Sequence, residues 1–281
     1  MKKTLIIVFL LLTVMIFADG WKKTGDFNLL LSQTYYSDNW DGGEMGNINW
    51  TASFNMIMEK QLSSMLYDKN TLKIAFGQTH YQERDDMGEL FWKRPEITTD
   101  LIDYENMLTF TLQKFVDPYL ALRYESKYYD GSNADETFYF NPSTITLSLG
   151  ARKVMIDQEI QNMEARLGAA YKSLLNQDEL IDNMSNAGVE FVLSYWYVFP
   201  SELGKYDSML RIYEALIYSE EDDALNDDWK SPDVEFTNTL TFKLSSYVGL
   251  KFYLEMLYDK EIVHEVRFKE NLGVNLSYSL F

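Results

Sequence analysis

The chain contains no cysteine, and histidine occurs only twice, at His80 and His264. Without cysteine the protein can form no disulfide and can carry no lipid on a lipoprotein cysteine, so its stability must come from packing and strand pairing. The paired cysteines or clustered histidines of a zinc site are missing, and so is a glycine-rich strand-to-helix loop for phosphate. We therefore expect no cofactor and no nucleotide chemistry.

Long apolar runs are also scarce, and the one that is present lies at the start of the chain. Lys2 and Lys3 precede an apolar run from Leu5 to Phe17, and Ala18 is followed by a polar segment. This layout is typical of a secretory signal peptide, and the run is shorter than the roughly 20 residues that a membrane-spanning helix needs. We predict that residues 1–18 are a cleaved signal peptide and that residues 19–281 form one domain.

Basic residues are also few relative to acidic residues. The chain has 25 Lys and Arg residues against 43 Asp and Glu residues, which gives a net charge of -18. Such an acidic chain repels phosphates, so we expect no binding to nucleic acid and no basic patch for anionic lipid. The mean hydropathy of -0.26 does not exclude a membrane protein, because a barrel spreads its apolar residues over alternate positions.

What the sequence does contain is alternation. Between Val266 and Phe281, apolar side chains alternate with small or polar ones almost without exception, and from Leu272 to Leu280 every second side chain is apolar. The apolar set is Leu272, Val274, Leu276, Tyr278 and Leu280; the other set is Asn271, Gly273, Asn275, Ser277 and Ser279. A strand points these two sets to opposite faces. A soluble sandwich also alternates in this way, but an exported chain with 15% aromatic residues and no spanning helix favours a membrane barrel.

About twelve segments show this period of two, each close to the length that a tilted membrane strand needs. They lie at residues 27–36, 47–58, 72–76, 108–112, 120–124, 145–151, 163–171, 189–197, 207–218, 234–244, 248–258 and 266–281. The phase of the ninth segment is ambiguous. The predicted fold is an all-β, transmembrane, antiparallel up-and-down barrel of about 12 strands.

The predicted links alternate between long and short, which is the habit of bacterial barrels with long outer loops. Long links are predicted at residues 83–103, 130–142, 173–186 and 219–233, and tight turns at Asp117-Pro118, Asp157-Gln158 and Ser245-Ser246. An even strand count places both termini in the periplasm. The link from Glu59 to Asn70 is longer than this scheme allows.

Both ends of the chain carry a family resemblance. The start has Trp21-Lys22-Lys23-Thr24-Gly25, then Asn39-Trp40 and Gly42-Gly43-Glu44, and the end has Phe268-Lys269-Glu270, Leu272-Gly273, Ser277-Tyr278 and Phe281. In these motifs the chain resembles a family of uncharacterised bacterial outer-membrane β-barrel proteins. The resemblance implies fold and location and carries no activity. Phe281 departs from the usual assembly signal, because it is out of phase with Tyr278 and Leu280.

Charged residues of both signs alternate with the apolar residues and are predicted to face the lumen. They are Arg123, Glu125, Lys127, Arg152, Glu164, Arg166, Lys172, Glu190, Glu235, Lys243, Lys251 and Glu255. Two interpretations stay open. Mixed charges inside a modest barrel favour a paired structural network, because a buried charge needs a partner, but they could also line a selective pore.

Two loops are further candidates. In the first, the Gly42-Gly43 pair permits a tight turn, and Trp40 beside Glu44 could anchor at the membrane interface or contact a ligand. In the second, an acidic run includes Asp222, Asp223, Asp227 and Asp228, whose oxygens could gather calcium next to lipopolysaccharide. The run lacks the ligand spacing and the turn glycine of a calcium loop, so a solvated loop is the alternative.

The function predicted from the sequence is passage of small solutes through the outer membrane, or envelope structure, without catalysis. One alternative is a ligand- or partner-binding surface protein that acts through acidic outer loops. Another is a lipid hydrolase using His80, although no spacing singles out a serine nucleophile. Expected partners are outer-membrane lipid, lipopolysaccharide and, through Phe281, the barrel assembly machinery. The oligomeric state is not predicted.

Overall fold

The computed structural model describes residues 20–36, 44–112, 114–133, 136–179, 181–219 and 227–280. Within these residues the regular structure is β-strand, apart from two short 3-10 turns, η1 (Pro200–Glu202) and η2 (Asp228–Lys230). No helix in this part of the chain is long and apolar enough to span a membrane.

Twelve long strands of the described residues make up the wall of the molecule. They are β1 (Lys22–Thr34), β2 (Asn47–Ser63), β3 (Leu66–Arg84), β5 (Glu96–Phe110), β6 (Asp117–Ser126), β9 (Ser143–Gln158), β10 (Gln161–Leu175), β11 (Met184–Val198), β12 (Gly204–Tyr218), β13 (Asp233–Lys243), β14 (Val248–Asp259) and β15 (Val263–Ser279). Three short strands, β4 (Leu90–Trp92), β7 (Tyr129–Asp130) and β8 (Phe138–Tyr139), lie in the links between them.

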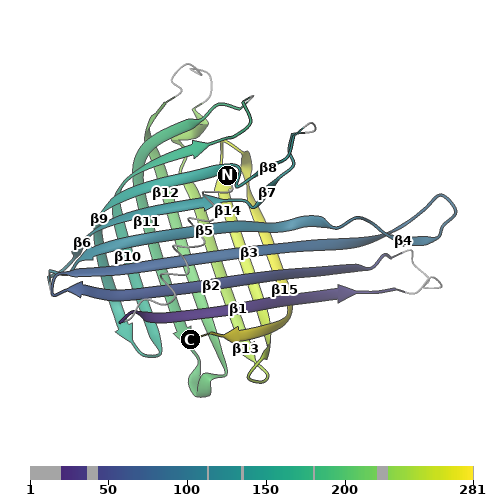
Figure 1. The fold of residues 1–281 in the computed structure, drawn as a ribbon, viewed down its shortest axis with the longest axis horizontal. Helices are drawn as coiled ribbons and strands as arrows, with labels where there is room; N and C mark the ends of the chain where they lie inside the picture. Colours follow the sequence, from purple (N-terminus) through teal and green to yellow (C-terminus); the bar gives the residue numbers. More distant parts are fainter. Residues whose placement is uncertain are drawn as a thin grey trace.

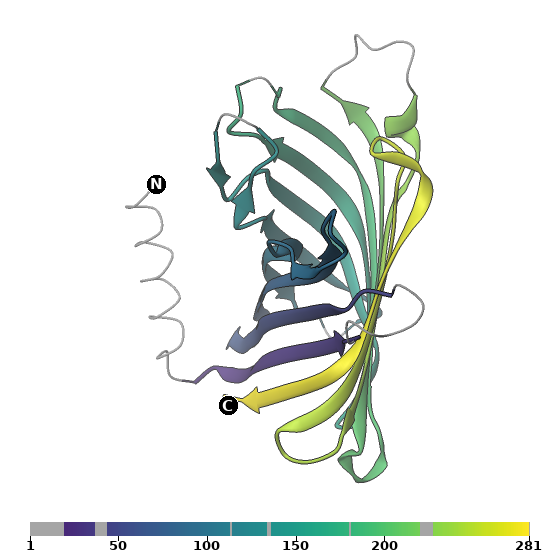
Figure 2. The ribbon, with the colours of Figure 1, turned by 90° about the vertical axis from the view of Figure 1, so that its right-hand side faces the viewer.

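The twelve long strands form a closed antiparallel barrel. Each strand pairs with the next one along the chain, β1 pairs with both β2 and β15, and the pairing of β2 with β3 completes the ring. Figure 1 shows β1, β2, β3 and β5 crossing in front of the strands of the opposite wall, and Figure 2 shows the two walls from the side. Closure pairs the backbone groups of every wall strand, which is what a sheet needs in hydrocarbon. The predicted all-β barrel of about 12 strands is confirmed.

The two faces of the wall differ in the way the alternation predicts. On β6, Leu120 and Leu122 are 41% and 47% exposed, whereas Ala121 and Arg123 between them are 2% and 7% exposed. Leu122 pairs with Leu147 of β9, which is also exposed. Apolar side chains therefore point outward and polar or small ones point inward, the reverse of a soluble barrel.

The links also alternate in length. One end of the barrel, which we call the long-link end, carries links 35–46, 85–95, 127–142, 176–183, 219–232 and 260–262. The other end, which we call the short-link end, carries links 64–65, 111–116, 159–160, 199–203 and 244–247. The start of β1 and the end of β15 also lie there. Only link 260–262 departs from the predicted alternation among the links bounded by described strands. In Figure 1, β3 and β4 extend past the other strands at the long-link end.

The predicted long link from Glu59 to Asn70 is wrong. β2 continues to Ser63, β3 begins at Leu66, and only residues 64–65 connect them. The error has a physical reason, since Asp68 and Asn70 occupy outward positions of β3 where the pattern expects apolar residues. Asn106 of β5 donates hydrogen bonds to Asp68 at 2.7 Å and to Asn70 at 3.0 Å, so these polar groups satisfy one another.

Other boundaries also differ from those predicted. Asp157-Gln158 is the end of β9 rather than a turn, and the turn lies at residues 159–160. Asp117-Pro118 is the start of β6 rather than a turn, and the turn lies at residues 111–116. Much of the predicted link 83–103 is strand, because β5 begins at Glu96. The ambiguous phase of the ninth segment has its origin in a bulge, since Gly188 pairs with Ala215 and Ala187 with Ile217, which leaves Leu216 without a partner in the register.

Candidate functional site

The barrel interior holds most of the charges that the sequence assigned to the lumen. Arg123, Glu125, Arg152, Glu164, Arg166, Lys172, Glu190, Glu235, Lys251 and Glu255 all lie on inward positions of their strands. One prediction needs correction, and one predicted residue lies on the inward set but at the rim of the barrel. Lys127 lies beyond the end of β6 and is exposed. Lys243 is the last residue of β13, where its exposed side chain lies 3.4 Å from Glu202 at the short-link end.

Arg123 is the centre of one group of interior charges. Its Nε and Nη2 donate to the two carboxylate oxygens of Asp103 at 2.9 and 3.0 Å, and Nη2 lies 2.8 Å from Glu125. The side chains of Arg123 and Asp103 are each only 9% exposed. A two-point contact of this kind fixes the guanidinium plane as well as neutralising the charge.

The same guanidinium reaches across the lumen. Arg123 lies 3.9 Å from Glu235, although β6 and β13 are separated in the sheet by β9, β10, β11 and β12. Glu235 in turn accepts a hydrogen bond from Arg211 at 3.1 Å, and Arg211 lies 3.3 Å from Glu190. Strands on opposite walls are thus connected by a continuous chain of ion pairs, which we call the cross-lumen bridge: Asp103, Arg123, Glu125, Glu235, Arg211 and Glu190.

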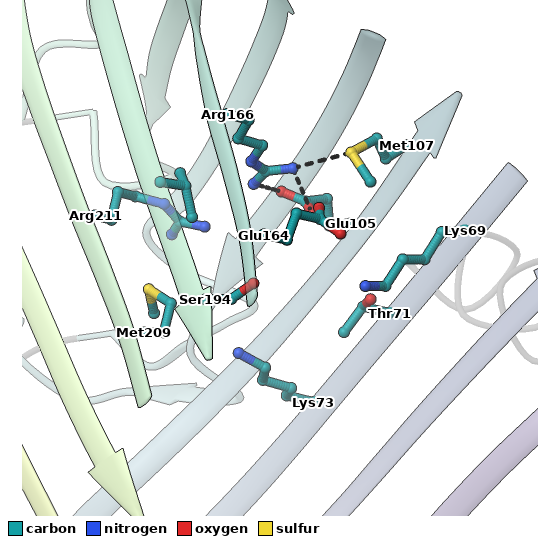
Figure 3. A pocket seen from close by; sticks show the side chains of 11 residues that line it. Lys69, Thr71, Lys73, Glu105, Met107, Glu164, Arg166, Ser194, Met209 and Arg211 are labelled. Atoms are coloured by element: carbon teal, nitrogen blue, oxygen red, sulfur yellow. Dashed lines mark hydrogen bonds and ion pairs between the residues drawn. The ribbon is translucent and has the colours of Figure 1, made fainter. Parts of the chain in front are cut away.

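A second group of charges lies nearer the short-link end. Arg166 of β10 donates to Glu105 of β5 at 2.9 and 2.5 Å, and Arg152 of β9 donates to Glu164 at 2.6 Å. β5 and β10 are not neighbours in the sheet, so the Arg166–Glu105 contact also runs through the interior. Figure 3 shows Arg166 and Glu105 meeting beside Met107.

A pair of glycines makes room for this second group. Gly150 of β9 and Gly168 of β10 are partners in the register, and Tyr119 of β6 pairs with Gly150. A Cβ at Gly168 would approach the backbone oxygen of Leu149 and would lie 2.8 Å from the Tyr119 hydroxyl. The Tyr119 ring fills the space that the glycines leave, and the Arg166 guanidinium lies over this ring with its central carbon 5.7 Å from the ring centroid.

Between these groups lies a cavity of about 120 Å³. Its walls come from β3, β5, β10, β11 and β12, and they include Lys69, Thr71 and Lys73 on one side and Ser194 and Arg211 on the other (Figure 3). Because desolvating an unpaired charge is costly, a carboxylate partner accompanies each of the four arginines described above, Arg123, Arg152, Arg166 and Arg211. The network therefore supports the wall and narrows the lumen at the same time.

Several interior charges were not predicted from the sequence. Asp103 and Lys69 fell inside predicted links, Arg211 lay in the segment of ambiguous phase, and Glu105 and Lys73 were not assigned to the lumen. A usable signal was present in the spacing of Lys69, Thr71 and Lys73, which places three polar side chains on one face of a strand.

The structure describes only part of the two candidate loops. Trp40, Gly42, Gly43, Asp222, Asp223 and Phe281 lie outside the described residues, as do residues 1–18. Glu44 is exposed. Asp227 lies 2.5 Å from Lys230, and Asp228 lies 2.7 Å from Lys260 and 2.8 Å from His264. Hydrogen bonds from Lys260 and His264 hold the pKa of Asp228 below its usual value. These two carboxylates are engaged by basic side chains, and the calcium site stays a prediction.

The two histidines lie far apart in the fold. His80 is in β3, opposite Ile48 of β2, and His264 is at the start of β15 against Asp228. Among the described residues, neither imidazole forms a hydrogen bond with a serine, so no serine–histidine pair is assembled there.

Comparison with known proteins finds structures of similar fold but no matching sequence. No protein-family model and no characterised protein sequence matches the chain, so the resemblance seen at its two ends stays a prediction. The structure is similar to an outer membrane channel from Pseudomonas putida F1, at 15% identity over 92% of this chain and 94% of that chain with a TM-score of 0.46. It is also similar to the translocator domain of the autotransporter NalP from Neisseria meningitidis, at 9% identity over 93% and 88% of the two chains with a TM-score of 0.37. A third similar structure is OprB from Pseudomonas putida, at 8% identity over 93% of each chain with a TM-score of 0.33. Identities and TM-scores of this size carry no activity from these proteins to this chain.

Proposed function

We propose that this protein is a bacterial outer-membrane barrel that lets small hydrophilic solutes cross by passive diffusion, without catalysis. The observation that supports the proposal is the inversion of polarity, with leucines such as Leu122 and Leu149 exposed outside and a hydrogen-bonded charge network inside. An apolar exterior fits lipid, and a polar interior fits water.

The dimensions of the wall agree with a membrane location. A tilted strand needs about 9–11 residues to cross the hydrocarbon core. The shortest of the twelve described wall strands, β6, has 10 residues, and β3 has 19. We place the long-link end outside the cell. The short-link end, which carries the start of β1 and the end of β15, then lies in the periplasm. In this placement outer-membrane lipid and lipopolysaccharide contact the outward leucines.

The interior sets a limit on solute size. The cross-lumen bridge divides the lumen, and the cavity beside it measures about 120 Å³. A cavity of this size has room for several water molecules, and therefore for a small ion that keeps part of its hydration shell. Because the bridge crosses the lumen, we expect large sugars and peptides to be excluded while it is intact.

Solute flux into vesicles tests this proposal. Residues 19–281 refolded into lipid vesicles are expected to admit glycine-sized solutes and to exclude oligosaccharides, measured by the rate of osmotic swelling. Shifted mobility on unboiled gels establishes that the barrel is folded in the same preparation. Vesicles with a folded barrel that admit no small solute at all would contradict the proposal.

An Arg123→Ala variant sharpens the same experiment. Removing this side chain breaks the bridge between β6 and β13 and is expected to raise the size limit for entry. Lys127→Ala is a matched control, because it removes one positive charge from an exposed position just beyond the same strand. Unchanged flux in the Arg123 variant would show that the bridge does not control passage.

A further inference from the structure

The arginines and lysines of the cavity wall differ in whether a carboxylate holds them. Arg166 is bound by Glu105, and Arg211 contacts Glu190 and Glu235. Lys69 and Lys73 of β3 form no ion pair within 4.0 Å with any carboxylate of the described residues. The cavity wall contains four basic residues and two acidic ones, since Glu164 joins Glu105 as the acidic members.

The carboxylates that face these lysines in the strand register have other partners. Lys73 lies opposite Asp103 in the β3–β5 register, and both oxygens of Asp103 are taken by Arg123. Lys69 lies opposite Glu59 of β2, which is 3.8 Å from Lys22. The basic side chains of the cavity wall that lack a close ion pair among the described residues are therefore these two lysines.

Hydroxyl groups line the same cavity as the two lysines. Thr71 lies between the lysines on β3, and all three side chains point to the lumen because their spacing is two. In Figure 3 the Lys73 ammonium points toward Ser194, which projects from β11 on the other side of the cavity. Two ammonium groups with hydroxyl donors beside them can replace part of the hydration shell of a small anion.

We propose that Lys69 and Lys73, assisted by Thr71 and Ser194, make this lumen selective for small anions such as chloride, phosphate and short carboxylates. The proposal rests on the proposed function, because selectivity has meaning only if solutes pass. It runs against the net charge of -18, which on its own favours cations. For an ion in the cavity, charges within the cavity wall have more influence than distant charges, since the Debye length is about 10 Å at 0.1 M salt.

The expected size of the effect follows from Coulomb's law. A unit charge about 6 Å from a passing ion changes its local concentration roughly twofold in water at 0.1 M salt, upward for anions and downward for cations. Each lysine is therefore expected to change the anion-to-cation permeability ratio by about fourfold, and the two together by more than tenfold.

The test is the reversal potential of refolded residues 19–281 in a planar bilayer under a potassium chloride gradient. The wild type is expected to prefer chloride, and Lys69→Gln and Lys73→Gln are each expected to lower the preference by about fourfold. A double variant with Lys69→Glu and Lys73→Glu is expected to prefer potassium. The control is Lys153→Gln, which removes a lysine from the outward face of β9.

The outcomes separate this inference from the proposed function. A conducting wild type that prefers potassium, or one whose preference is changed equally by Lys153→Gln and by the two lumen substitutions, would overturn the anion selectivity and leave passage intact. A folded wild type without conductance would overturn the proposed function and the inference with it. Shifted mobility on unboiled gels confirms that each variant is folded before it is measured.

Discussion

Arg123→Ala removes the cation at the centre of the cross-lumen bridge and is the most informative single substitution for stability. Asp103 and Glu125 lose their ion pair with Arg123, and Glu235 loses one of its two basic partners but keeps Arg211. Removing one member of a buried ion pair costs about 3–5 kcal/mol, because the remaining charge stays desolvated, whereas an exposed pair contributes at most about 1 kcal/mol.

The structure places the expected loss at the lower end of that range. Asp103 is 9% exposed, but Glu125 and Glu235 are 30% and 27% exposed, so water in the lumen can solvate these two in the variant. We expect a decrease in the free energy of unfolding of about 3 kcal/mol, which is roughly a 150-fold change in the folding equilibrium.

Equilibrium unfolding in lipid vesicles, followed by the fluorescence of the six tryptophans, measures this loss. Lys127→Ala is the matched control and is expected to change stability by less than about 0.5 kcal/mol, since its side chain is exposed. In a double-mutant cycle with Asp103→Ala, the two losses are expected to be far from additive. A cost below about 1 kcal/mol for Arg123→Ala would refute the reasoning that the bridge is buried and tightly paired.

Three further predictions address the wall, the interior and the outer links. Leu149→Arg places a charge on the lipid face and is expected to lower stability in vesicles by about 2–4 kcal/mol, measured by the same unfolding assay; no loss would mean that this face does not meet lipid. Gly168→Val is expected to cost about 1–3 kcal/mol, because its Cβ would collide with backbone of β9, and a neutral result would contradict the close approach of the two strands. Because hydrogen bonds from Lys260 and His264 depress the pKa of Asp228, the contact between η2 and the start of β15 is expected to be present above the unfolded-state pKa of about 3.9 and lost as the pH falls through the lower folded-state pKa. Hydrogen exchange of η2, compared at each pH with Asp228→Asn, measures this, and identical pH profiles for the two proteins would exclude the contact as the cause.

The strands with uniform alternation could be predicted from the sequence, whereas those with a local exception could not. Segments 145–151 and 248–258 lie inside β9 and β14. The start of β3 was missed because Asp68 and Asn70 interrupt the apolar face, and their hydrogen-bond partner Asn106 is distant in the sequence. The phase of β12 was obscured by the extra residue Leu216, which a pattern of strict period two does not accommodate.

The interior charges could be predicted one by one but not as pairs. Alternation alone assigns Arg166 and Glu164 to the lumen. It does not show that Arg166 binds Glu105 while Arg152 binds Glu164, because such pairing depends on the stagger of the strands around the ring. The same stagger decides that Arg123 reaches Glu235 on the opposite wall.

Single-channel recording of refolded residues 19–281 in a planar bilayer is the most direct test of a water-filled path narrowed by the cross-lumen bridge. The structure predicts small, discrete conductance steps for the wild type and larger steps for Arg123→Ala, since the bridge occupies part of the lumen. A barrel that is folded, as shown by its shifted gel mobility, and that passes no current with or without Arg123 would contradict the account.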